Sequence, residues 1–171
     1  MSGVARAVDR GVDLRSVVGL LDRETELLVE LSYDLAVLGM LARSSDTEFL
    51  RRGQDQAEAT AEQLRLTGLL RAVRSAAIAE SVGLPAGARL GELVEALPEA
   101  EAETLRQARL RILRALARAQ DVAERTSSVL GQKIAGVREA LAAVGADPAG
   151  VYGPGGGREA TATAQILRRV L

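Results

Sequence analysis

Three glutamates near residue 26 form the group in this sequence whose spacing most resembles that of a metal-binding site. Glu24, Glu26 and Glu30 fall on one predicted helix, and di-iron bundle proteins hold their metals with glutamates together with Glu-x-x-His pairs. The chain contains no histidine and no cysteine, so that ligand set cannot be completed. We therefore expect solvated helix charges here, and neither a bound metal nor a cofactor.

The same two absences narrow the enzyme chemistry that the chain could support. Without histidine or cysteine there is no Ser-His-Asp triad, no thiol nucleophile and no His/Cys zinc site. Carboxylate, hydroxyl and arginine chemistry remain. We predict no catalytic residues, and a binding or structural role becomes the leading class.

Four arginines of the last long predicted helix could form a phosphate-binding face: Arg111, Arg114, Arg118 and Arg125. The whole chain has 22 basic and 23 acidic residues and only 2% aromatic residues. A balanced charge and the lack of interleaved aromatics favour a solvated bundle surface over a nucleic-acid interface. We expect no nucleic-acid partner.

Glycines at 153 and 155–157 invite comparison with a phosphate-binding loop. No strand precedes them and no Gly-Lys-Ser/Thr follows, so they are typical of a linker. Tyr152 stands within this linker and is one of three aromatic residues, with Tyr33 and Phe49. Two alternatives stay open for its ring: packing on the last turn of the preceding helix, or serving as an exposed anchor for a partner.

The elements that carry these residues are predicted to be helices throughout, which makes the fold all-α. A heptad pattern predicts a first helix from about Val17 to Ala42, with Leu21, Leu28 and Leu35 spaced seven apart. Glu24 interrupts this seam, and we interpret it as an acidic residue near the helix start that favours the macrodipole.

A second helix is predicted from the capping-box spacing of Ser45 and Glu48 to about Ser81. The short break before it predicts an antiparallel hairpin with the first helix. Its predicted apolar set is Leu50, Ala57, Leu64, Leu69, Leu70, Val73 and Ile78.

A loop at 82–87 leads to a short amphipathic helix marked by Leu90, Leu93, Val94 and Leu97. Pro98 then opens the longest helix, which is predicted to run to about Val144 before Gly145 and Pro148. The apolar stripe of this helix is predicted to comprise Leu105, Ile112, Leu116, Ala119, Ala123, Leu130, Ile134, Val137, Leu141 and Val144.

Three long helices with apolar stripes predict an elongated antiparallel bundle or coiled coil. We assign residues 1–146 to this helical bundle domain and 147–171 to a flexible C-terminal tail. The tail could hold a short helix with Ile166, Leu167, Val170 and Leu171 on one side. Residues 1–20 lack a continuous apolar segment and no apolar run is long enough to span a bilayer. We expect a cytoplasmic protein without membrane insertion.

The order of these segments resembles the FlgN-type flagellar export chaperones. The similarity covers the Leu/Glu-rich first helix at 20–28, the Gly-Leu-Pro-Ala-Gly loop at 83–87, the Leu-Gly-Glu-Leu segment at 90–93, the long last helix and the Val-Tyr-Gly-Pro-Gly-Gly tail at 151–156. The chain departs from the family at 126–128, where Thr-Ser-Ser stands in place of the Asn-rich polar residues of many members.

This resemblance implies a chaperone that binds C-terminal helical segments of the hook-filament junction (hook-associated) proteins, keeps them unassembled and delivers them to the type III export gate. Tyr152 matches the tail tyrosine with which the family contacts the gate. Late positions of the long helix have fewer obvious partners within the chain, so we predict that the client binds there. The predicted client-binding residues are Leu130, Ile134, Val137, Leu141 and Val144.

Two other classes remain as alternatives. One is a structural or adaptor coiled coil without a client, for which self-association would be the signature. The other, less favoured, is a nucleic-acid-binding regulator that uses the face from Arg111 to Arg125.

Overall fold

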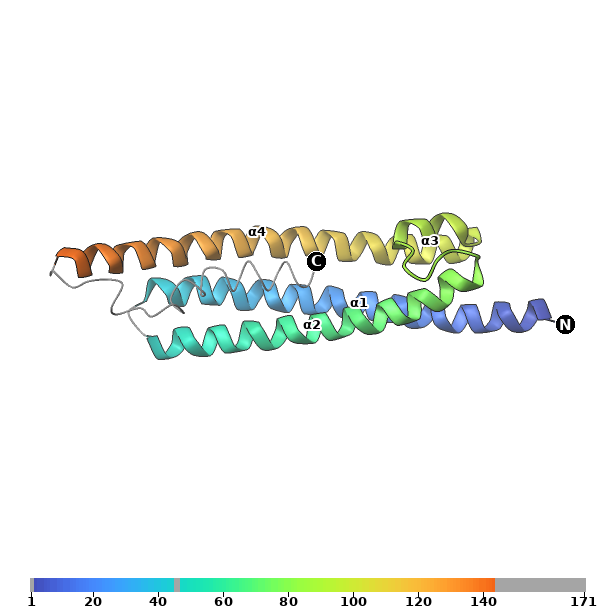
Figure 1. Cartoon of the computed structure of the whole chain (residues 1–171), viewed down its shortest axis with the longest axis horizontal. Helices are drawn as coiled ribbons and strands as arrows, with labels where there is room; N and C mark the ends of the chain where they lie inside the picture. Colours follow the sequence, from blue (N-terminus) through green and yellow to red (C-terminus); the bar gives the residue numbers. More distant parts are fainter. Residues whose placement is uncertain (1, 45–46, 144–171) are drawn as a thin grey trace. The chain divides into compact units, whose positions relative to one another are not determined.

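The computed structural model describes residues 2–44 and 47–143, with side chains for 11–44 and 48–140. Four helices make up most of this part, and no strand occurs in it (Figure 1). They are α1 (Ser2–Arg43), α2 (Thr47–Ser81), α3 (Leu90–Ala96) and α4 (Glu99–Ala143). The all-α prediction is confirmed.

The chain packs as two compact units, each built from stretches of α1, α2 and α4. Among the described residues, unit 1 comprises 2–29 and 62–117, and unit 2 comprises 30–44, 47–61 and 118–143. The predicted boundary between bundle and tail, at 146/147, lies outside the described residues.

Contacts within each unit give the helix directions. In unit 2, the bond from Thr126 to Leu35 and the bond from Lys133 to Ser44 advance together along α4 and α1, so these two helices run parallel. Gly53 of α2 lies near Leu38 and Leu41, whereas Thr60 bonds to Asp34, so α2 runs antiparallel to α1. In unit 1, the pairing of Arg71 with Glu24 and of Arg74 with Asp13 gives the same antiparallel order. The predicted hairpin is confirmed.

Unit 1 has a continuous apolar core to which all four helices contribute. Val17 and Leu21 of α1, Ile78 of α2, Leu93 of α3 and Leu105 of α4 are fully buried in it. The side of α4 that faces this core carries mostly short side chains, because Ala102 and Ala108 lie there with Leu105. The unit therefore packs by close approach of helices around a few large side chains.

Helix α1 begins at Ser2, so the prediction of a start near Val17 was wrong. The helix extends toward the N-terminus because Leu14 is buried in the unit 1 core and Asp13 pairs with Arg74. Tertiary packing therefore supports residues that show no heptad pattern of their own.

The ends of the other helices match the sequence closely. Helix α2 ends in a Schellman motif: Gly83 has a φ of 78°, the Leu84 N–H donates to the Ala79 carbonyl at 2.8 Å, and the Gly83 N–H donates to the Glu80 carbonyl. Pro98 immediately precedes α4, and its carbonyl accepts from the Ala102 N–H. Ser45, the proposed cap of α2, lies outside the described residues.

Candidate functional site

The candidate binding surface on α4 begins where α4 is held against α1 in unit 2. The buried Thr126 hydroxyl donates to the Leu35 carbonyl at 2.8 Å. The two backbones come close at this point, because a Cβ added to Gly39 would stand 3.2 Å from Thr126 Oγ1. Thr126 of the Thr-Ser-Ser segment thus forms a helix contact in this chain.

The residue that follows α1 makes a second contact with α4. The Lys133 ammonium group donates to the Ser44 carbonyl at 2.6 Å, just after α1 ends at Arg43. Helix α4 continues to Ala143, which at 1.5 Å per residue is about 15 Å beyond Lys133. Figure 1 shows this end of α4 running on past the end of α1.

We call the part of α4 that continues past the end of α1 the overhang. It determines how exposed the predicted client-binding residues are. Leu130 and Ile134 are half-buried, whereas Val137 is 37% exposed and every residue from 135 to 140 is exposed. The Leu141 side chain lies outside the described side chains, and Val144 and Tyr152 lie outside the described residues altogether. Three of the five predicted positions therefore follow one another along α4, with exposure increasing toward the helix end.

This surface of α4 can bind a partner helix by burying apolar side chains. Leu130, Ile134 and Val137 have the spacing of four and three residues that lets one helix pack against another. The described part of the chain contains no group of three or more His, Cys, Asp or Glu side chains that could hold a metal ion.

A buried hydrogen bond joins α2 to α1 in unit 2. The Thr60 hydroxyl of α2 donates to Asp34 Oδ2 of α1 at 2.7 Å, and both residues are buried. Together with the contacts of Thr126 and Lys133, this bond holds all three helices of the unit in one register. The α4 end is thus presented by a fixed scaffold.

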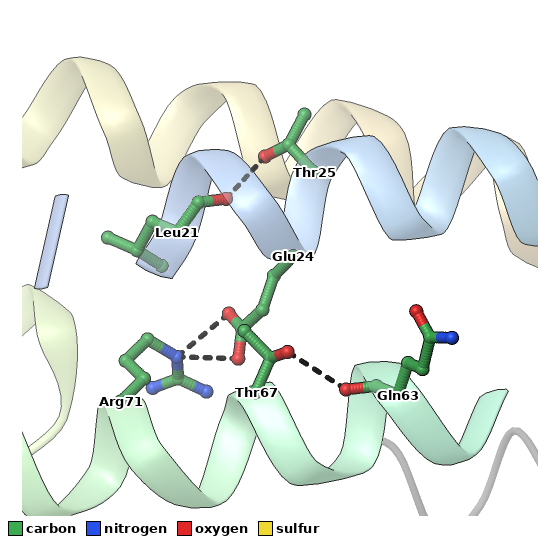
Figure 2. Close-up of polar contacts among 6 residues, drawn as sticks. All are labelled: Leu21, Glu24, Thr25, Gln63, Thr67 and Arg71. Atoms are coloured by element: carbon green, nitrogen blue, oxygen red, sulfur yellow. Dashed lines mark hydrogen bonds and ion pairs between the residues drawn. The ribbon is translucent and has the colours of Figure 1, made fainter. Parts of the chain in front are cut away.

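A buried ion pair in unit 1 corrects the interpretation of Glu24. This residue lies well inside α1, is only 3% exposed, and accepts two bonds from Arg71 Nε at 3.0 and 2.8 Å (Figure 2). Burial raises the pKa of the Glu24 carboxyl above its ordinary value, and the attraction of Arg71 opposes that shift. The expectations that Glu24 is a solvated charge and that it lies near a helix start were both wrong: the carboxylate interrupts the apolar seam because α2 supplies its counter-ion.

The four arginines of α4 are divided between the two units, Arg111 and Arg114 in unit 1 and Arg118 and Arg125 in unit 2. Arg111 donates to Asp22 Oδ1 of α1 at 2.6 Å. All four are exposed.

An apolar face of α2 in unit 1 was not found from the sequence. In unit 1, the core positions of α2 are Leu64, Ser75, Ile78 and Ala79. Arg71 pairs with Glu24 of α1. Leu69, Leu70 and Val73 are exposed by 53, 60 and 70%, so the prediction that they belong to the inward stripe was wrong. The five-residue steps from Leu64 to Leu69 and from Val73 to Ile78 were the available signal, since such steps change the helix face.

Searches with protein-family models, against curated proteins and against solved structures find no match for the chain. The described helices include none with the length and hydropathy needed to cross a bilayer. The fold defines an all-α bundle. Because the comparisons indicate no function, any function must be argued from the surfaces of this bundle.

Proposed function

We propose that this protein is a cytoplasmic export chaperone of the FlgN type, which binds C-terminal helical segments of flagellar hook-associated proteins and delivers them to the type III export gate. The observation that supports the proposal is the overhang of α4 beyond Lys133 and Ser44. It leaves an apolar face, with Ile134 and Val137, that α1 does not cover. A client helix packed there would bury residues that it otherwise uses in its own assembly.

The test is calorimetric titration of the full chain with a C-terminal helical peptide of a hook-associated protein. The double variant Ile134→Asp, Val137→Asp should reduce client affinity at least about tenfold, because two charges would enter an apolar interface. Since Ile134 is half-buried, the single variant Val137→Asp at an exposed position provides the same test with less risk to the fold.

The matched control is Leu110→Asp, Leu113→Asp, which places the same charges on exposed positions of α4 in unit 1. It should leave client affinity unchanged, and circular dichroism should show full helicity for every variant. Equal affinity of the Val137→Asp protein and the wild type would place the client site elsewhere.

A further inference from the structure

The outward face of α2 in unit 1 carries a regular apolar seam of its own. Its positions are separated by 4, 3, 4, 3 and 4 residues, which keeps them on one side of the helix. We call this set the outer seam: Glu62, Leu66, Leu69, Val73, Ala76 and Glu80. Leu70 lies beside it. The central large side chains are 48–70% exposed, so no part of the described chain covers them.

Exposure of this extent is unusual for a helix that already has a buried face. In the segment 66–79 the charged residues are Arg71 and Arg74, and both pair toward α1, with Glu24 and Asp13. The helix is thus apolar on two opposite sides, which is typical of a helix packed between two neighbours.

The seam is self-complementary when one copy is turned end over end. Its spacing reads the same in both directions, so an antiparallel copy places Leu66 against Ala76 and Leu69 against Val73. Each inner layer then combines a larger with a smaller side chain, as close packing requires. A parallel arrangement would instead place Leu66 against Leu66 and Ala76 against Ala76, giving layers of unequal width.

The charges at the seam ends fit the same arrangement. Antiparallel pairing brings Glu62 next to Glu80 of the partner subunit, and Arg65 supplies the cation at that point. Arg65 already donates to both carboxylate oxygens of Glu62, at 2.8 and 2.7 Å, and its side chain is 40% exposed. One guanidinium beside two carboxylates at each end offsets their repulsion.

We propose that the outer seam of α2 is a homodimer interface, in which two copies of this chain pair antiparallel about a twofold axis near residue 71. The contact is isologous, so it closes after two subunits and does not propagate. The seam has only four apolar positions per subunit, Leu66, Leu69, Val73 and Ala76, whereas a stable interface involves ~20–30 residues per side, so the dimer dissociates on dilution. The proposal is independent of client binding on α4.

The first experiment is sedimentation velocity of the full chain from about 1 μM to about 1 mM. The wild type should pass from monomer to dimer within this range. Leu69→Asp should raise the midpoint concentration at least about tenfold, because each dimer would bury two carboxylates. Leu110→Asp, an exposed leucine of α4 in the same unit, is the matched control and should leave the midpoint unchanged.

The second experiment uses the absence of cysteine from the chain. Mixed and oxidised Leu66→Cys and Ala76→Cys proteins should form the mixed disulfide in preference to either like pair. Preferred like pairs would overturn the antiparallel arrangement. A wild type that stays monomeric over the whole range, or a dimer unaffected by Leu69→Asp, would overturn the interface itself, and the seam would then accept a different helix.

Discussion

Arg71 of α2 directs a single nitrogen, Nε, at both carboxylate oxygens of Glu24 of α1, and does so from a position where its own side chain is 28% exposed. The glutamate is almost completely buried at 4% side-chain exposure. The pair therefore joins a desolvated anion to a cation that keeps part of its hydration. The contact fixes the register of α1 against α2 within unit 1.

Removing one partner of this pair should destabilise the protein more than removing both. Arg71→Leu leaves the Glu24 carboxylate buried without a cation, and we expect a loss of about 2–3 kcal/mol in the free energy of unfolding, below the full value for a buried pair because Arg71 is partly hydrated. Glu24→Leu combined with Arg71→Leu should lie within about 1 kcal/mol of the wild type. Urea denaturation of the four proteins of the double-mutant cycle measures the coupling. Additive losses would show that the pair contributes no coupling energy.

Stability should also respond to pH through Glu24. Because burial raises the pKa of this carboxyl in the folded state, the folded chain binds the proton more tightly than the unfolded chain does. The contribution of Glu24 to stability therefore increases as pH falls through its folded pKa toward 4.5. The wild type should gain stability relative to Glu24→Gln when urea titrations are moved from pH 7 to pH 5. A relative loss on acidification would mean that the Arg71 attraction exceeds the cost of burial.

Two helix glycines of unit 2 should respond in opposite directions to alanine. Gly131 has no atom within 4 Å of an added Cβ, so Gly131→Ala should stabilise the protein by about 0.5–1 kcal/mol through helix propensity. At Gly39 the added Cβ would stand 3.2 Å from the Thr126 hydroxyl, which donates to Leu35. Gly39→Ala should therefore lose that gain or become destabilising. Thermal melts of the two variants compare them directly, and equal gains would show that α1 and α4 can separate without cost.

A similar contrast concerns two buried hydroxyls. Ser75 Oγ is buried without a hydrogen-bond partner, alone among the described buried side-chain polar atoms, whereas Thr126 Oγ1 donates to a carbonyl. Ser75→Ala should raise the free energy of unfolding by about 1 kcal/mol, and Thr126→Val should lower it by a similar amount. Chemical denaturation distinguishes the two. A loss for Ser75→Ala would indicate that its hydroxyl has a partner in solution.

The remaining prediction concerns delivery and depends on the proposed function. Tyr152→Ala should leave the stability of the bundle and the affinity for the client nearly unchanged, and should weaken binding to the cytoplasmic domain of the export gate. The reason is that a ring in a Gly/Pro-rich segment can reach a second partner while the helices hold the client. Calorimetry with the isolated gate domain measures this, with Tyr33→Ala as the control tyrosine. A lower melting temperature with unchanged gate affinity would instead assign Tyr152 to packing on the helix.

Element type could be predicted from the sequence because local signals and the fold agree. Gly83 ends α2 where only a left-handed residue completes the Schellman motif, and Pro98 precedes α4 where no N–H is needed. Spacings of three and four residues located the α4 core at Leu105, Ala119 and Ala123, all of them buried. Each of these features depends on neighbours within a few residues along the chain.

The candidate α4 surface could be predicted only in part. The periodicity of Leu130, Ile134 and Val137 shows that they share a helix face, but not what covers that face. Coverage depends on where α1 ends relative to α4, which the Lys133–Ser44 contact fixes between residues 89 positions apart.

By itself, the sequence determined that the described part of the chain is helical, where α2 ends and α4 begins, and that no histidine or cysteine is present. Tertiary structure alone decided that Glu24 is a buried ion-paired residue, that Leu69, Leu70 and Val73 face outward, and that α4 continues beyond the end of α1. The physical reason is that helix propensity, capping and periodicity are local, whereas burial is set by which helices approach each face. When a helix such as α2 has apolar residues on two sides, its periodicity cannot show which side the other helices cover.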